Sequence, residues 1–138
     1  MPALSFSVFK DKIVKGIKNQ TIRPKRKNPI KVEDWLAIYW KQRSPKESEK
    51  LGESICSEVF PIIIYDGMIY CLNEKRFFTK QETDELIWMD GFPERDEFFD
   101  FFREHYGFPF EGDVIRWYPL EKKRTFKNGL RGLWKKAY

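Results

Sequence analysis

The chain has 138 residues and a formal net charge of +5, and 41% of its residues are hydrophobic and 17% aromatic. This length is typical of one domain, which excludes a large multidomain enzyme, and the apolar content excludes disorder of the whole chain. The longest apolar stretch, residues 59–65, is far shorter than the roughly 20 residues of a membrane helix. Cys56 and Cys71 lack the neighbours of a metal site or a disulfide framework, so we expect both to be buried free thiols. We therefore expect a soluble cytoplasmic protein without a membrane segment, a metal or a cofactor.

The charge is distributed in three blocks along the chain. Residues 1–50 hold 13 Lys and Arg against 5 Asp and Glu, residues 51–118 hold 6 against 15, and residues 119–138 hold 7 against 1. The net charges of the blocks are therefore +8, −9 and +6. Such a distribution is typical either of a positive face that attracts a polyanion such as RNA or of ordinary solvated surface.

The first elements expected are a short strand and a helix. Leu4 and Phe6 alternate with serines, which predicts a strand that leads into the domain. Apolar residues then recur at helical spacing over residues 9–17, with Ser7 as the expected N-cap and Gly16 near the C-terminal end.

Strands are expected through the middle of the chain and at its end. Residues 18–29 contain two prolines and predict a basic loop around a short extended piece at residues 21–23. Pro61 favours an edge or bulged strand over residues 55–65, which turns at Asp66-Gly67 into a hairpin. The other expected strands cover residues 35–40, 68–72, 76–78 and 114–118.

Two consecutive helices are expected before the last strand. Thr79 and Glu82 form a capping-box pattern at the start of a helix over residues 79–89 that ends at Asp90-Gly91. A phenylalanine-rich helix follows over residues 94–106. This order lacks the alternation of a doubly wound sheet, so we predict a mixed α and β fold: a small barrel of five or six strands with three packed helices. The barrel domain covers residues 1–120, and a basic aromatic extension covers residues 121–138.

The segment Gly16-Ile17-Lys18-Asn19-Gln20-Thr21-Ile22-Arg23 has the most unusual chemistry of the chain. A glycine lets the chain leave a helix sharply, after which Thr21 and Arg23 lie on one side of an extended segment. Two cations around a hydroxyl suit a phosphate or a base edge, and a desolvated lysine could activate Thr21 as a nucleophile. The alternative is a solvated basic loop. His105, the only histidine, lies in the last turn of a helix and is expected to cap carbonyl groups there.

These residues carry a resemblance to a known family. The pattern GxKxxTxR after a first helix, the acidic turn Glu33-Asp34, the helix end Asp90-Gly91-Phe92 and the strand end Ile115-Arg116-Trp117 together resemble the ASCH domain family of the PUA-like superfamily. The resemblance covers about residues 4–118. It implies a small β-barrel associated with RNA, with a cleft lined by the Lys18–Arg23 segment and by the end of the helix at Asp90.

The resemblance implies two kinds of function. Some family members bind or process RNA, and others remove the acetyl group from acetylcytidine with a lysine, a threonine and a glutamate. The motif places Lys18, Thr21 and Asp90 at these catalytic positions, although aspartate is one methylene shorter than the glutamate. We expect an RNA-binding or modified-nucleoside-binding protein, with amidohydrolase or RNA-processing nuclease activity as the alternative. The expected ligand-binding side chains are Arg23, Lys25, Arg26, Trp40, Lys41 and Arg43.

Overall fold

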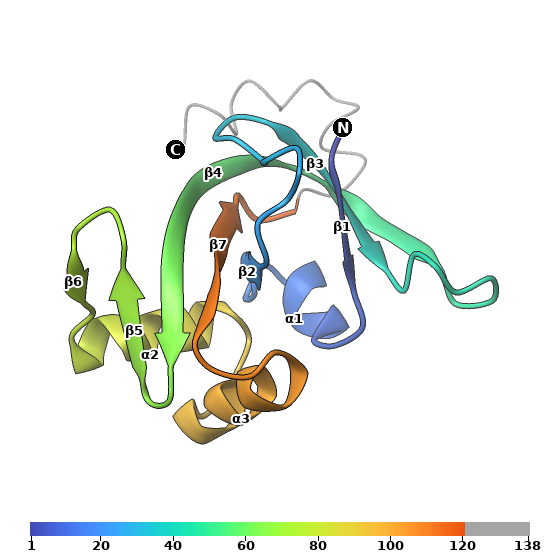
Figure 1. Cartoon of the computed structure of the whole chain (residues 1–138). Helices are drawn as coiled ribbons and strands as arrows, with labels where there is room; N and C mark the ends of the chain where they lie inside the picture. Colours follow the sequence, from blue (N-terminus) through green and yellow to red (C-terminus); the bar gives the residue numbers. More distant parts are fainter. Residues whose placement is uncertain (121–138) are drawn as a thin grey trace.

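A computed structural model describes residues 1–120, which form a mixed α/β fold of seven strands and three helices (Figure 1). The expected extension over residues 121–138 lies outside the described residues. The strands are β1 (Ala3–Phe6), β2 (Gln20–Arg23), β3 (Trp35–Trp40), β4 (Glu49–Tyr65), β5 (Met68–Cys71), β6 (Arg76–Phe77) and β7 (Phe110–Trp117). The helices are α1 (Lys10–Val14), α2 (Lys80–Met89) and α3 (Arg95–His105).

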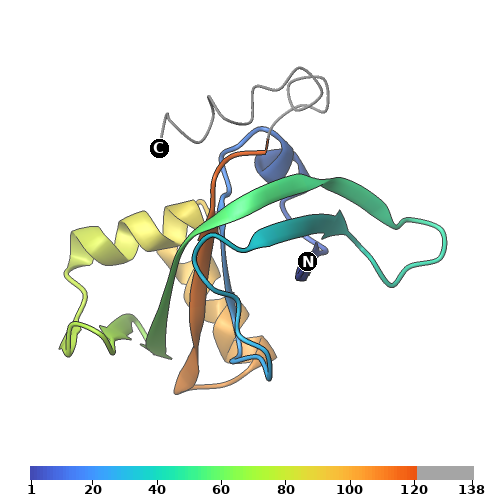
Figure 2. The same ribbon diagram turned by 90° about the horizontal axis from the view of Figure 1, so that it is seen from above.

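The long curved strand β4 organises the sheet. Its first part pairs with β3 through residues 49–55, and its second part pairs with β7 on one side and with β5 on the other. Strand β1 runs parallel to β3, and β2 is antiparallel to β7. Figure 2 shows β4 bending from one group of strands to the other.

The expected mixed fold with three helices is confirmed, but the seven-stranded sheet is open and does not form the expected barrel. Among the described residues, β1 pairs only with β3 and β2 pairs only with β7, which leaves the ring β1-β3-β4-β7-β2 open between its two outer strands. A side chain spans this opening: NH2 of Arg23 on β2 donates to the carbonyl oxygen of Ser5 on β1 at 2.7 Å. Helix α1 packs beside the opening, because Ile13 is buried with Leu4 of β1 and Trp117 of β7.

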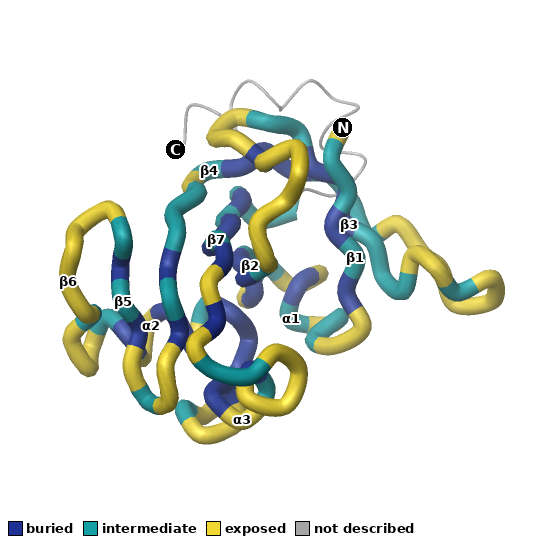
Figure 3. The backbone as a smooth tube through the Cα atoms, viewed as in Figure 1, coloured by how far each residue is buried: buried dark blue, intermediate teal, exposed yellow. Residues whose placement is uncertain are grey.

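Two apolar clusters lie on either side of β7. One is enclosed by β1, β3, the first part of β4 and α1. The other lies between the second part of β4 and helices α2 and α3, where Ile62 and Ile64 meet Leu86, Phe98 and Phe102. Figure 3 shows buried residues on the strands, including β7, and on parts of the helices, while exposed residues lie mostly in the connecting segments. The apolar faces of α2 and α3 therefore cover one side of the sheet, as the spacing of their apolar residues predicts.

Several local predictions are confirmed. Thr79 and Glu82 form the complete capping box of α2. The hairpin turns between Tyr65 and Met68. Cys56 and Cys71 are buried free thiols.

Other local predictions were wrong. Helix α1 is shorter than residues 9–17, and its N-cap is Phe9 with a φ of 63° rather than Ser7. Strand β4 is not an edge, because residues 56–64 pair with β7 and residues 62–65 pair with β5, but it is bulged as the alternative predicted, with a register shift between Cys56 and Glu58. The carbonyl of Pro61 accepts from the amide of Leu72 at 3.3 Å. The β4–β5 ladder stops at Ile62, so the missing N–H of Pro61 falls where no ladder bond is needed.

Candidate functional site

The turn after α1 carries the motif residues into the interior of the protein. Gly16 has a φ of 77°, and the amide of Lys18 donates to the carbonyl of Lys12 at 3.0 Å. A side chain at Gly16 would be strained in this left-handed conformation. The chain therefore turns sharply from α1 into β2, and the Lys18 side chain is buried.

The Lys18 ammonium is held at the C-terminal end of α2. Its Nζ donates to the backbone carbonyl of Asp90 at 2.5 Å and to that of Gln20 at 2.7 Å. It also lies 3.7 Å from Oδ1 of Asp90. The ring centroids of Phe6 and Phe9 lie 5.5 and 5.8 Å from Nζ, within the range of cation–π attraction. The charge is thus compensated by two carbonyl dipoles, a carboxylate and two rings.

The Asp90 carboxylate belongs to a connected buried network. Gln20 Nε2 donates to Oδ1 of Asp90 at 3.0 Å and to the carbonyl of Leu86 at 3.1 Å. Gln20 Oε1 accepts from Nε of Arg116 at 2.9 Å, and Arg116 also pairs with Glu58 at 2.9 Å. These bonds satisfy Gln20, which is fully buried, and fix the end of α2 against β2 and β7.

Gln20 and Arg116 are site residues that were not predicted from the sequence. Gln20 occupies the same face of β2 as Ile22, which is buried in the apolar cluster under α2. A polar residue at a position of the strand that faces the core is the signal that would have identified it. Arg116 was named only in the strand-end pattern Ile115-Arg116-Trp117, which assigns no role to its side chain.

Burial controls the ionisation of Lys18 and Asp90. It lowers the pKa of Lys18, and the charge of Asp90 opposes this effect. It raises the pKa of Asp90, and the charge of Lys18 opposes that effect in turn. Desolvation therefore favours the neutral form of each group, which is the form of Lys18 that could accept a proton.

Thr21 and Arg23 form a second contact on the other face of β2. Arg23 Nε donates to Oγ1 of Thr21 at 3.0 Å, and its guanidinium lies 4.9 Å from the centroid of the Phe6 ring. Together with the bond to Ser5, these contacts hold the guanidinium on three sides. Burial lowers the pKa of Arg23, but a guanidinium stays charged at physiological pH.

A basic cleft of about 670 Å³ opens beside Arg23. Its walls come from β1 and the residues after it, from the end of β2 and the segment that follows, and from the turn after β3. The lining includes four cationic side chains and no carboxylate. The cations are Arg23, Arg26, Lys41 and Arg43. We call this feature the basic cleft.

The structure brings the predicted site residues together in two groups. Lys18 and Asp90 meet in the buried network, whereas four of the six expected ligand-binding residues line the basic cleft. Thr21 is buried and contacts the cleft through Arg23. Lys25 is exposed and is not part of the lining. Trp40 is half-buried at the end of β3, where Lys41 Nζ lies 5.4 Å from its ring centroid.

Three further points concern His105, metal binding and membrane spans in the described residues. His105 Nδ1 lies 2.9 Å from the carbonyl oxygen of Phe101, which confirms its contact with the last turn of α3. Residues 1–120 contain no group of three or more His, Cys, Asp or Glu side chains able to hold a metal ion. No helix in the same residues has the length and apolar content needed to cross a bilayer.

Comparisons of the chain with models of protein families, with curated proteins and with solved structures give no match.

Proposed function

We propose that the chain binds RNA, or a modified nucleoside within RNA, through the basic cleft. The observation that carries this proposal is the convergence of four cationic side chains from three separate segments on one cleft whose lining has no carboxylate. Fields of neighbouring cations add, and a concave surface concentrates them. A polyanion releases bound counterions when such a cleft neutralises its phosphates, which provides affinity without sequence specificity.

Other residues around the cleft suit RNA rather than a small inorganic anion. The hydroxyl groups of Ser5, Ser7 and Ser44 line it and can hydrogen-bond to phosphate or sugar oxygens. Trp40 lies directly before Lys41 in the chain, so a partly exposed ring adjoins the cations. Single-stranded RNA is commonly bound by this combination of aromatic stacking and positive charge. The resemblance of the Gly16–Arg23 motif to the ASCH family supports the same ligand class.

The test is the binding of a fluorescent single-stranded oligouridylate, followed by anisotropy between about 50 and 200 mM salt. The variant Arg26→Gln/Arg43→Gln removes two exposed cations of the cleft. Each lost phosphate contact should reduce the magnitude of the logarithmic salt slope by about 0.7, so this variant should lose about 1.4.

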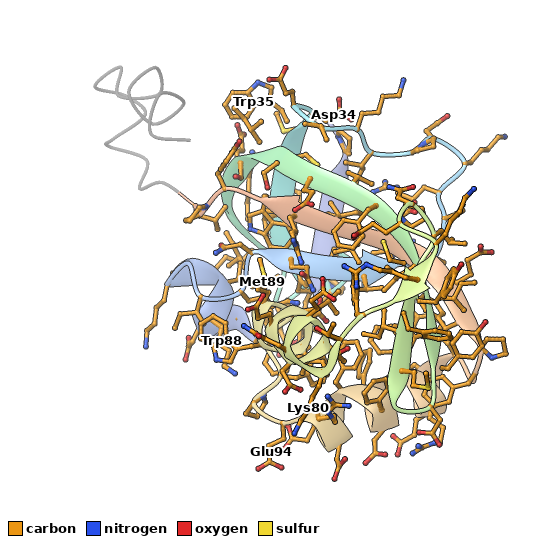
Figure 4. All side chains as sticks on the ribbon, turned by 90° about the vertical axis from the view of Figure 1, so that its left-hand side faces the viewer. Asp34, Trp35, Lys80, Trp88, Met89 and Glu94 are labelled. Carbon is orange, nitrogen blue, oxygen red and sulfur yellow. The ribbon has the colours of Figure 1, made fainter. Side chains whose placement is uncertain are left out.

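The matched control is Lys75→Gln/Lys80→Gln, which removes two exposed cations outside the cleft lining. Figure 4 labels Lys80, which begins α2. The control should bind as the wild type does. Absence of binding by the wild type at low salt, or equal losses in both variants, would refute the proposed function.

A second candidate is the deacylation of acetylcytidine by Lys18, Thr21 and Asp90. One observation favours it: Lys18 is buried. Burial lowers the pKa of this lysine, and a neutral lysine can act as a general base. Against it, Lys18 Nζ already donates to two backbone carbonyls. Turnover of acetylcytidine that is lost in Lys18→Ala and in Thr21→Ala, and increased in Asp90→Glu, would support this candidate. Binding of RNA without turnover in the wild type or in Asp90→Glu would eliminate it.

A further inference from the structure

We infer that Thr21 is a positioning residue, which presents the guanidinium of Arg23 to a phosphate group of RNA in the basic cleft. This inference rests on the proposed function and assigns its principal phosphate contact. It gives Thr21 a role through Arg23 rather than through direct attack on a substrate.

The geometry of Arg23 is the first support. Nε donates to Oγ1 of Thr21 at 3.0 Å, and NH2 donates to the carbonyl of Ser5 at 2.7 Å. The ring of Phe6 lies 4.9 Å from the guanidinium carbon. The side chain therefore has a fixed position at the opening between β1 and β2, on the wall of the basic cleft.

The remaining donors of Arg23 are the second support. A guanidinium has five N–H groups in a planar fork. The two bonds described above use one hydrogen each, on Nε and on NH2. The NH1 amino group and the second hydrogen of NH2 remain, and paired N–H groups of this kind match the oxygens of a phosphate.

The contrast with the other cations of the cleft is the third support. Arg26 and Arg43 are exposed, and Lys41 pairs with Glu47 at 2.9 Å. Arg23 is instead held by a hydroxyl and a carbonyl, which do not neutralise it. A charged group that is already immobilised loses less conformational freedom when it binds, so Arg23 should contribute more to affinity than its exposed neighbours.

The fourth support is the burial of Thr21, which is only 5% exposed. A buried hydroxyl has little access to RNA, so any effect of its loss on binding must pass through a neighbour. Arg23 is the neighbour that donates to this hydroxyl and also lines the cleft.

The test uses the salt dependence of oligouridylate binding by the full chain, because the slope counts phosphate contacts and a merely structural change does not alter it. Arg23→Gln and Thr21→Val should each reduce the magnitude of the slope by about 0.7 and weaken binding roughly fivefold at about 0.1 M salt. Thr21→Ser keeps the acceptor oxygen and should retain the slope and affinity of the wild type. The double variant Thr21→Val/Arg23→Gln should bind no more weakly than Arg23→Gln alone.

The control is Arg26→Gln, whose effect should add to that of Thr21→Val because Thr21 does not hold Arg26. An unchanged slope in Thr21→Val, or additive losses in the double variant, would overturn the inference while leaving RNA binding intact. If Thr21→Val does not fold, Arg23→Lys tests the same claim: it keeps the charge but loses both the planar fork and the Nε–H that donates to Thr21, and should weaken binding, although by less than Arg23→Gln does. Binding by Arg23→Lys equal to that of the wild type would overturn the inference. Failure of the wild type to bind would refute the proposed function itself.

Discussion

The Lys18 ammonium lies 3.7 Å from a carboxylate oxygen of Asp90, and both side chains are almost completely buried. The pair joins the turn before β2 to the C-terminal end of α2. Gly91, directly after Asp90, has a φ of 101°, and a Cβ there would lie 2.9 Å from the Phe9 ring and 3.1 Å from Cδ of Lys18. A glycine at this position therefore allows the end of α2 to approach the lysine closely.

Breaking this pair on one side should destabilise the fold more than removing both charges. Lys18→Met leaves the Asp90 carboxylate buried without its cation, at a cost of about 3–5 kcal/mol in the free energy of unfolding. Lys18→Met/Asp90→Asn removes both charges and keeps an acceptor oxygen for Gln20, so it should be more stable than the sum of the single losses predicts. Urea denaturation of Lys18→Met, Asp90→Asn, the double variant and the wild type measures this. Additive losses would show that the two groups are energetically independent.

The stability of the protein should depend on pH through Asp90. Burial raises the pKa of Asp90 in the folded chain above 3.8, the ordinary value, which we take for the unfolded chain. At a pH between the unfolded and the folded pKa, the folded chain therefore binds more protons than the unfolded chain. The contribution of Asp90 to stability is therefore complete below pH 3.8 and is lost as the pH rises through the folded pKa.

Asp90→Asn removes this titration and provides the reference. The difference in free energy of unfolding, wild type minus variant, should decrease as the pH increases from about 4 to about 7. Denaturant unfolding of both proteins at several pH values measures it. A difference that increases with pH would show instead that Lys18 lowers the pKa of Asp90 overall.

Local sequence signals predicted the helices and strands well, but they did not predict that the sheet stays open. The capping box of Thr79 and Glu82 and the strand Trp35–Trp40 were predictable, because each depends on neighbours within a few residues. The open sheet was not predictable from such signals. It depends on Arg23 reaching Ser5 in place of a β1–β2 ladder, which is a contact between residues distant in sequence.

The candidate site could likewise be predicted from the sequence only in part. The motif identified Lys18, Thr21 and Arg23, but spacing alone could not show that Lys18 is buried while Arg23 lines a cleft. Gln20 lies between them and connects Asp90 to Arg116. Its role depends on which face of β2 meets α2, and that is decided by tertiary packing.

Lys41 occupies a strained position that supports a binding role. Its φ is 44°, a conformation that costs a side-chain-bearing residue about 1–2 kcal/mol. Lys41→Gly relieves this strain and removes the exposed pair with Glu47, which is worth less than about 1 kcal/mol. We therefore expect the variant to be at least as stable as the wild type in thermal unfolding but to bind oligouridylate several-fold more weakly. Unchanged binding would show that Lys41 does not contact the ligand.

The central claim is that RNA occupies the basic cleft, and amide chemical shifts in ¹H–¹⁵N NMR spectra test it most directly. Titration of the labelled protein with a short single-stranded oligouridylate at low salt should perturb amides in three segments that line the cleft. The lining residues of these segments are 3–7, then 23, 24 and 26, and then 41–44. The account predicts that the shifts concentrate there, and that Arg26→Gln/Arg43→Gln reduces them at the same RNA concentration. Shifts confined to α2 and to the β5–β6 turn, or no shifts at all, would contradict it.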